Sequence, residues 1–180
     1  MRIQAQDSVL LVVDLQSRLL PAIHEGESVL ANAIWLVDVA QTLKIPVLAT
    51  EQYPQGLGLT EANLRARLPE SAIIEKIYFS AIPEGKLLKH ADAQHQQWIV
   101  VGTEAHVCVQ QTVLDLLAQG LAVFVVEEAV GSRKPRDKAL ALERMRQHGA
   151  EIVSREMVAF ECLGQANTPE FRAVLQRFLR

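Results

Sequence analysis

Hydrophobic residues along the chain follow two alternating patterns. Short continuous apolar runs, typical of strands buried on both faces of a sheet, occupy residues 9–13, 45–49, 72–74, 98–101 and 121–126, and residues 151–153 are predicted to form a short sixth strand. Apolar residues at helical spacing predict helices over residues 28–43, 108–120, 135–149 and from Thr168 onward. Residues 50–64, with Pro54, Gly56 and Gly58, are predicted to form an ordered loop.

This alternation of strands and helices predicts the fold class. Strands that alternate with helices imply right-handed crossovers and a mostly parallel sheet. The chain shows no internal repeat, low-complexity tract or linker. We therefore expect one α/β domain over residues 1–180, a three-layer sandwich with helices on both faces of the sheet.

The composition disfavours several classes of function. The chain has 180 residues, 49% of them hydrophobic, and a formal net charge of −3. This mild charge, with no cluster of Lys or Arg interleaved with aromatic residues, argues against a nucleic-acid partner. No apolar run approaches membrane-spanning length, and the first residues lack a signal-peptide pattern. We therefore expect no membrane partner and a cytoplasmic location.

Cys108 stands where the apolar run 98–101 passes through Gly102 into a helix. A thiol at the first turn of a helix meets backbone N–H groups and the positive end of the helix dipole, and both favour the thiolate. Cys108 is therefore a candidate nucleophile, the alternative being a small, buried, inert residue. The other cysteine, Cys162, lies in a late helical stretch and is predicted to be a core residue. Without CxxC spacing, the two cysteines predict neither a disulfide framework nor a metal site.

Two charged residues end predicted strands, and they are expected at the same edge of the sheet as Cys108. Asp14 ends the first strand and Lys76 the third. Because ligands bind beyond the carboxyl ends of parallel strands, all three side chains are expected at one rim. A carboxylate can take the thiol proton there, and an ammonium stabilises both anions. The alternatives are a turn-forming Asp and a solvated surface Lys.

The sequence gives little support for a cofactor or metal. No G-x-G-x-x-G follows the first strand and no P-loop is present, which removes the usual nucleotide hypotheses. The five histidines show no HxH or HExxH spacing. His106 could act as a base toward Cys108. However, side chains two residues apart, where a strand passes into a helix, rarely point the same way, so His106 is interpreted as part of the turn.

Four segments resemble the isochorismatase-like cysteine hydrolase superfamily, in that family's order. They are LLVVDLQ around Asp14, TEQYPQGLG from Thr50, EKIYFSA around Lys76 and GTEAHVCVQQTVLDL around Cys108. The resemblance implies a six-stranded parallel sheet of strand order 3-2-1-4-5-6, a catalytic triad of Asp14, Lys76 and Cys108, and a homo-oligomeric assembly. The second segment is similar to isochorismatase domain-containing proteins, which leaves the substrate open.

The resemblance also implies a cis peptide bond between Thr103 and Glu104, and an oxyanion hole formed by the N–H groups of Glu104 and Cys108. Nicotinamidase-type members hold a metal with Asp and His residues after the second strand, where this chain has TEQY at residues 50–53. A metal-dependent nicotinamidase is therefore disfavoured. The member that gives the superfamily its name needs no cysteine, so Cys108 favours the thiol-dependent branch.

The leading hypothesis from the sequence is hydrolysis of a small-molecule amide through a thioester on Cys108. Gln16, Tyr53, Tyr78 and Phe79 are candidates for the substrate pocket, although aromatic residues at such positions can equally be core or subunit-interface residues. Two hypotheses of a different class stay open: a non-enzymatic oligomeric binding module on the same fold, and a redox-sensing thiol protein.

Overall fold

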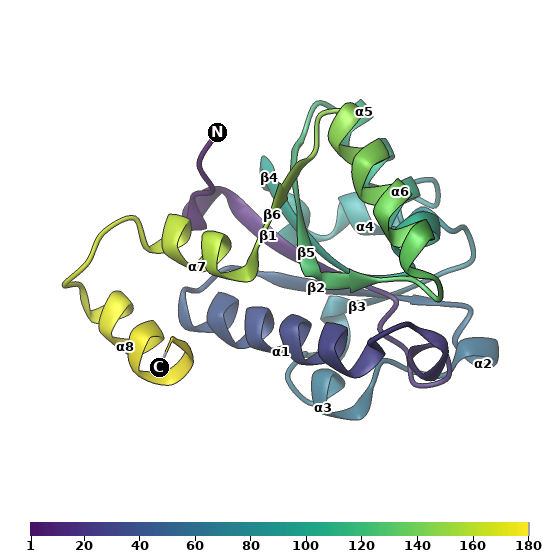
Figure 1. Ribbon diagram of the computed structural model, residues 1–180, viewed down its shortest axis with the longest axis horizontal. Helices are drawn as coiled ribbons and strands as arrows, with labels where there is room; N and C mark the ends of the chain where they lie inside the picture. The colour runs from purple at the N-terminus through teal and green to yellow at the C-terminus, as the bar shows by residue number, and fades with distance from the viewer. Residues whose placement is uncertain (180) are drawn as a thin grey trace.

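Six parallel strands form the centre of the protein in the computed structural model, which describes residues 1–179 (Figure 1). In chain order they are β1 (Ser8–Val13), β2 (Val47–Gln52), β3 (Ile73–Lys76), β4 (Gln97–Thr103), β5 (Ala122–Gly131) and β6 (Glu151–Val153). They are arranged β3-β2-β1-β4-β5-β6, and every neighbouring pair is parallel. The predicted sheet and its strand order are confirmed.

Helices cover both faces of the sheet, which confirms the three-layer architecture (Figure 1). On one face lie α1 (Gly26–Thr42) and α7 (Arg155–Leu163), and on the other α5 (Gln110–Ala118) and α6 (Pro135–Gln147). The last helix, α8 (Pro169–Phe178), packs against α1. Short helices in the connections are α2 (Pro54–Leu57), α3 (Ala62–Arg65) and α4 (Lys86–Lys89). None of the helices within residues 1–179 is long and apolar enough to cross a membrane.

The central strand β1 contributes to both hydrophobic cores. Leu10 and Val12 pack in the core beneath α1, whereas Val9, Leu11 and Val13 pack in the core beneath α5 and α6. Successive side chains of a strand point to opposite faces of the sheet. Because both faces are covered, every position must be apolar, which explains the continuous hydrophobic run.

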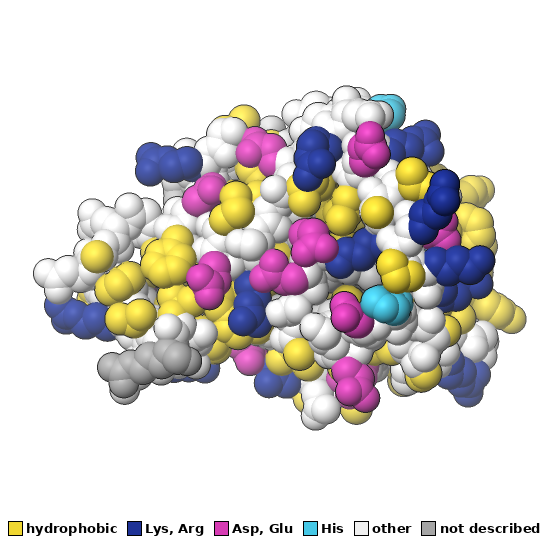
Figure 2. All heavy atoms as spheres, in the orientation of Figure 1, with side chains coloured by type: hydrophobic (Ala, Val, Ile, Leu, Met, Phe, Trp, Pro, Cys, Tyr) yellow, Lys and Arg dark blue, Asp and Glu magenta, His cyan; other side chains and the backbone are white. Residues whose placement is uncertain are grey.

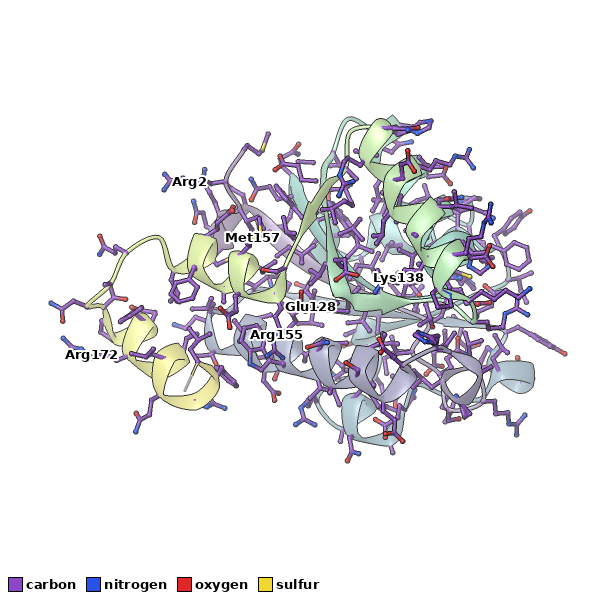
Figure 3. All side chains as sticks on the ribbon, in the orientation of Figure 1. Arg2, Glu128, Lys138, Arg155, Met157 and Arg172 are labelled. Atoms are coloured by element: carbon purple, nitrogen blue, oxygen red, sulfur yellow. The ribbon has the colours of Figure 1, made fainter. Side chains whose placement is uncertain are left out.

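Helix α7 is tied to its neighbours by Arg155, which Figure 3 shows beside Glu128 of β5. The backbone N–H of Arg155 donates to Glu128 Oε1 at 3.2 Å, and its guanidinium lies 4.7 Å from the centroid of the Trp35 ring on α1. Cation–π contacts of this kind favour arginine over a neutral residue. These contacts join α7 to α1 and to β5.

Two predicted boundaries are wrong. Residues 50–64 hold the end of β2 together with α2 and α3, because Pro54 suits the first turn of a helix and the Glu61 side chain caps α3. Strand β5 continues past Glu127 to Gly131, because its register against β4 shifts between Val100 and Gly102. Glu127 and Glu128, which follow the predicted end of the strand, therefore lie in a bulge within β5.

Gly102 allows β4 to approach β1 closely near the end of both strands. Its φ is +121°, and a Cβ built there would lie 2.0 Å from the carbonyl oxygen of Val13, so only glycine fits. The next residue, Thr103, donates its hydroxyl to the carbonyl oxygen of Asp14 at 2.8 Å. The end of β4 is thereby joined to the residue that follows β1.

Candidate active site

Asp14 and Lys76 form a buried ion pair at the carboxyl end of the sheet. Asp14 follows β1 with a φ of 47°, and Lys76 is the last residue of β3. Lys76 Nζ lies 2.9 Å from Asp14 Oδ2, and the two side chains are 3% and 0% exposed. Strand β2 lies between β1 and β3, so the ion pair spans the end of β2.

Residues at the end of β2 and in the loop after β3 complete the hydrogen bonding of this pair. The Thr50 hydroxyl donates to Asp14 Oδ1 at 2.7 Å. Lys76 Nζ also donates to Gln52 Oε1 at 2.7 Å and to the carbonyl oxygen of Phe79 at 2.8 Å. Buried charges are tolerated only when they are paired and hydrogen-bonded, and both charges here meet that condition.

Cys108 lies in one π-helical turn, Ala105–Val109, between β4 and α5. It is 7% exposed, and Asp14 and Lys76 lie near enough for both charges to act on its thiol. Burial raises the pKa of the Cys108 thiol far above its ordinary value, the negative charge of Asp14 raises it further, and the ammonium of Lys76 lowers it. Because the raising effects win, the group at rest near neutral pH is the protonated thiol.

The expectation that the helix terminus favours a thiolate is opposed by the burial of Cys108, which raises its pKa. The sequence places Cys108 at a helical turn, but it does not show that the sulfur leaves water and faces a carboxylate. Desolvation penalises the anion and is the largest cause of the raised pKa. A reaction at the sulfur would require Cys108 to lose its proton.

Iodoacetamide should alkylate Cys108 slowly near neutral pH. The thiolate is the reacting form, so a thiol of raised pKa should show a rate that climbs about tenfold per pH unit across the neutral and mildly alkaline range without a plateau. Peptide mapping by mass spectrometry measures the rate, with glutathione as the reference thiol. Cys162 is an internal comparison, because burial and Glu161 raise its pKa to about 12. A plateau for Cys108 below the glutathione midpoint would contradict the protonated resting state.

The turn before Cys108 is closed by hydrogen bonds to Glu104. The Thr103–Glu104 peptide bond is cis. The carbonyl oxygen of Glu104 accepts from the N–H groups of Val107 at 3.0 Å and Val109 at 3.2 Å. Glu104 and Cys108 therefore lie at the start of this turn and within it, and the oxyanion hole formed by their N–H groups stays a prediction.

Gln16 does not lie in a substrate pocket, so that prediction is wrong. It is 0% exposed, and its amide nitrogen donates to the carbonyl oxygens of Gln52 at 3.0 Å and Gly58 at 2.7 Å. Its amide oxygen accepts from the backbone N–H of Gln52 at 2.8 Å. With both amide hydrogens used, Gln16 joins the loop after β1 to the loop after β2.

The three aromatic residues predicted for the pocket lie on the surface of the chain beside Lys76. Tyr53, Tyr78 and Phe79 are 52%, 59% and 54% exposed. The backbone, rather than the ring, of two of them reaches the site, since Lys76 donates to the carbonyl oxygens of Tyr78 and Phe79. Their rings therefore form an open apolar rim in the single chain.

Glu51 offers a buried carboxylate close to the site, but its Oε1 oxygen already accepts hydrogen bonds from neighbouring residues. Glu51 Oε1 accepts from the N–H and hydroxyl of Thr60 at 2.8 and 2.7 Å and from the guanidinium of Arg65. Among residues 1–179 no group of three His, Cys, Asp or Glu side chains is placed to hold a metal ion. Glu51 instead anchors the loop between β2 and α3.

The fold and this site define a class of protein: a doubly wound α/β protein with a thiol, a carboxylate and an ammonium at the carboxyl ends of its strands. The family model for the isochorismatase domain matches residues 8–157, so the chain belongs to the isochorismatase family. It is 35% identical over 173 residues to isochorismatase domain-containing protein 2A of Mus musculus, covering 96% of this chain and 83% of that protein.

Two solved structures show the same fold over almost the whole chain. The structure of MAR1 ribonuclease from Caenorhabditis elegans superposes with a TM-score of 0.91 at 39% identity, covering 100% of this chain and 93% of that one. The YcaC gene product of Escherichia coli, an octameric hydrolase of unknown specificity, superposes with a TM-score of 0.81 at 24% identity, covering 99% and 96%. The second likeness is one of fold alone.

Proposed function

We propose that the protein is a cysteine hydrolase that cleaves the C–N bond of a small amide through a thioester on Cys108. The observation that carries the proposal is the buried Asp14–Lys76 ion pair, whose two charges both act on the pKa of the Cys108 thiol. A nucleophile is activated when a base lies within reach of its proton and a third group holds the base in place. Asp14 is that base, and Lys76 holds it.

In the first half of the reaction, Cys108 becomes acylated. The sulfur attacks the amide carbonyl carbon while Asp14 takes the thiol proton, so an S–C bond forms and the carbonyl oxygen becomes an oxyanion. The N–H groups of Glu104 and Cys108 donate to that oxyanion. The C–N bond then breaks, Asp14 gives its proton to the departing amine, and the acyl group stays on the sulfur as a thioester.

In the second half, water releases the acyl group. Asp14 takes a proton from the attacking water, the C–S bond breaks, and the proton returns to the Cys108 sulfur as the carboxylic acid leaves. Lys76 keeps its charge throughout, because its ammonium is held by Asp14, Gln52 and backbone carbonyl oxygens. Its part is electrostatic: it holds Asp14 and balances negative charge at the sulfur.

A homo-oligomer with a small-molecule substrate is part of the same proposal. Support comes from the octameric assembly of the E. coli protein with this fold. The apolar rim of Tyr53, Tyr78 and Phe79, more than half exposed in the single chain, also fits a surface that another molecule covers.

A panel of small primary and secondary amides, followed by intact-mass spectrometry after acid quenching, tests the proposed reaction. A substrate should leave a transient mass increase equal to its acyl group, located on Cys108 by peptide mapping, together with release of the amine. The variant Cys108→Ser should show no thioester. Amine release without any acyl adduct, unaffected in Cys108→Ser, would reject the thioester route.

RNA cleavage is the second candidate, because the C. elegans structure at 39% identity is that of a ribonuclease. The charge of this chain argues against it. Its formal net charge is −3, and on the face drawn in Figure 2 the Lys and Arg side chains are interspersed with Asp and Glu rather than gathered in one basic patch. RNA cleavage that persists in Cys108→Ser would favour this candidate over amide hydrolysis.

A redox-sensing thiol and a non-enzymatic binding module have less support from the site. Oxidation proceeds through the thiolate, and burial and Asp14 keep Cys108 protonated. Cys162 packs against the core on the opposite face of the sheet from Cys108, so it is not placed as a resolving partner. A chain that assembles normally, keeps Cys108 inert and turns over no amide would be a binding module.

A further inference from the structure

We propose that Ser132 and Arg133, the two residues that follow β5, are positioning residues for the oxyanion hole. They hold the turn that carries Glu104 and Cys108 from outside the site. This inference rests on the proposed function, because an oxyanion forms only if Cys108 attacks a carbonyl group. It assigns a part in catalysis to a loop that contributes no group to the reacting atoms.

Arg133 holds the residue at the start of the turn through two hydrogen bonds. The carboxylate oxygen Oε2 of Glu104 accepts from the backbone N–H of Arg133 at 3.0 Å and from its Nε at 3.1 Å. The side chain of Glu104 is 10% exposed and that of Arg133 is 61% exposed. A largely buried carboxylate is thus tied to one residue by both a main-chain and a side-chain donor.

Ser132 holds the same turn two residues further on. The hydroxyl oxygen of Ser132 lies 2.9 Å from Nδ1 of His106. Ser132 is itself fixed, because it is 1% exposed and its carbonyl oxygen accepts from the N–H of His24 at 3.0 Å. The ladder between β4 and β5 pairs Thr103 with Gly131, so the two loops leave the sheet side by side.

These contacts hold the turn in place on both sides of Ala105. Glu104 and His106 are each tied to the loop after β5, and Cys108 lies two residues beyond His106. An oxyanion hole works only when its donors are already in place as charge develops, and a displacement of about 1 Å can cost about 100-fold in rate. Loosening either contact should therefore slow attack on a carbonyl group without removing the nucleophile or the base.

Two reactions of Cys108 distinguish the contribution of the oxyanion hole from the reactivity of the thiol itself. Acylation by p-nitrophenyl acetate passes through a tetrahedral oxyanion and releases p-nitrophenolate as the acetyl thioester forms. Alkylation by iodoacetamide is a direct displacement of iodide at carbon and forms no oxyanion. In the double variant Ser132→Ala/Arg133→Ala we expect acylation to slow by about 10- to 100-fold while alkylation at mildly alkaline pH changes by less than about twofold.

Variants of Glu104 and of a neighbouring exposed arginine complete the design. Glu104→Ala removes the shared acceptor and should slow acylation to a similar extent, whereas Glu104→Gln keeps an oxygen for both Arg133 donors and should restore most of the rate. Arg136→Ala removes an exposed arginine from the first turn of α6 and should leave both reactions unchanged. With an amide substrate, the loss should fall on kcat and leave KM unchanged.

Three results would overturn the proposal, each in a recognisable way. Acylation at the wild-type rate in the double variant and in Glu104→Ala would show that the turn needs no external support. An equal fall in acylation and alkylation would indicate general disruption of the site. A rise in KM with unchanged kcat would mean that Arg133 binds the substrate. If wild-type Cys108 is alkylated but never acylated, the proposed function itself fails, and the inference fails with it.

Discussion

Replacing Asp14 with asparagine should make Cys108 easier to deprotonate and at the same time nearly abolish turnover. The carboxylate is one of the groups that raise the pKa of the thiol, so its loss lowers that pKa and speeds alkylation at a given pH. Asparagine cannot accept the proton during attack or deliver it to the leaving amine. Loss of a general base costs about 10²- to 10⁴-fold in rate, and here one group serves both half-reactions.

The opposite responses of the two rates make this test specific. Iodoacetamide alkylation and amide hydrolysis are measured on the same preparations, with circular dichroism to verify folding. Asp7→Asn is the matched control, because Asp7 is an exposed carboxylate immediately before β1, at the other end of the strand that Asp14 follows. Wild-type hydrolysis in Asp14→Asn would remove Asp14 from the mechanism, and slower alkylation would contradict the charge effect on the thiol.

The sequence carries enough information to place the three charged or nucleophilic groups at one edge of the sheet. Asp14, Lys76 and Cys108 each follow or end an apolar run of strand length, and the carboxyl ends of parallel strands share an edge. Contact between Asp14 and Lys76 also requires the strand order, since one strand separates theirs. The hydrophobic pattern predicts the strands, and the family resemblance predicts their order.

The supporting hydrogen bonds depend on strand register, which the apolar pattern does not determine. Gln52 pairs with Lys76 across β2 and β3, and Thr50 pairs with Val13 across β2 and β1. These pairings place the amide and hydroxyl beside Lys76 and Asp14. A signal was present, because polar residues inside a buried strand need partners, but their partners are fixed only once the strands are aligned.

Burial explains why two site residues differ from what their positions in the sequence suggest. Cys108 was expected as a thiolate from its position in the chain, yet its pKa depends on how much water and which charges surround the sulfur. Gln16 was expected to face a ligand, yet two loops that are remote in sequence enclose its amide. Residue type and local position describe what a group can do, whereas the packing of distant segments decides whether it meets solvent.

Replacing Lys76 with methionine should cause a large loss of stability. Methionine fills most of the space but leaves the Asp14 carboxylate, 0% exposed, with the Thr50 hydroxyl and no cation. Breaking a buried ion pair by removing one partner costs about 3 to 5 kcal/mol of unfolding free energy. Urea denaturation at neutral pH measures the loss as a lower midpoint at unchanged slope.

Two further variants distinguish the cost of leaving a buried charge unpaired from the cost of losing a lysine side chain. Lys86→Met removes a lysine whose side chain is 56% exposed and pairs with Glu84, and it should change the unfolding free energy by less than about 1 kcal/mol. The double variant Asp14→Asn/Lys76→Met carries no charge at either position of the pair and should regain most of the stability that Lys76→Met loses, as a double-mutant cycle would quantify. If the double variant is no more stable than Lys76→Met, the cost lies in lost packing and lost bonds to Gln52 rather than in an unpaired carboxylate.

The same double variant also tests catalysis. It should fold without the base and the cation, and it should still lack acyl transfer to Cys108.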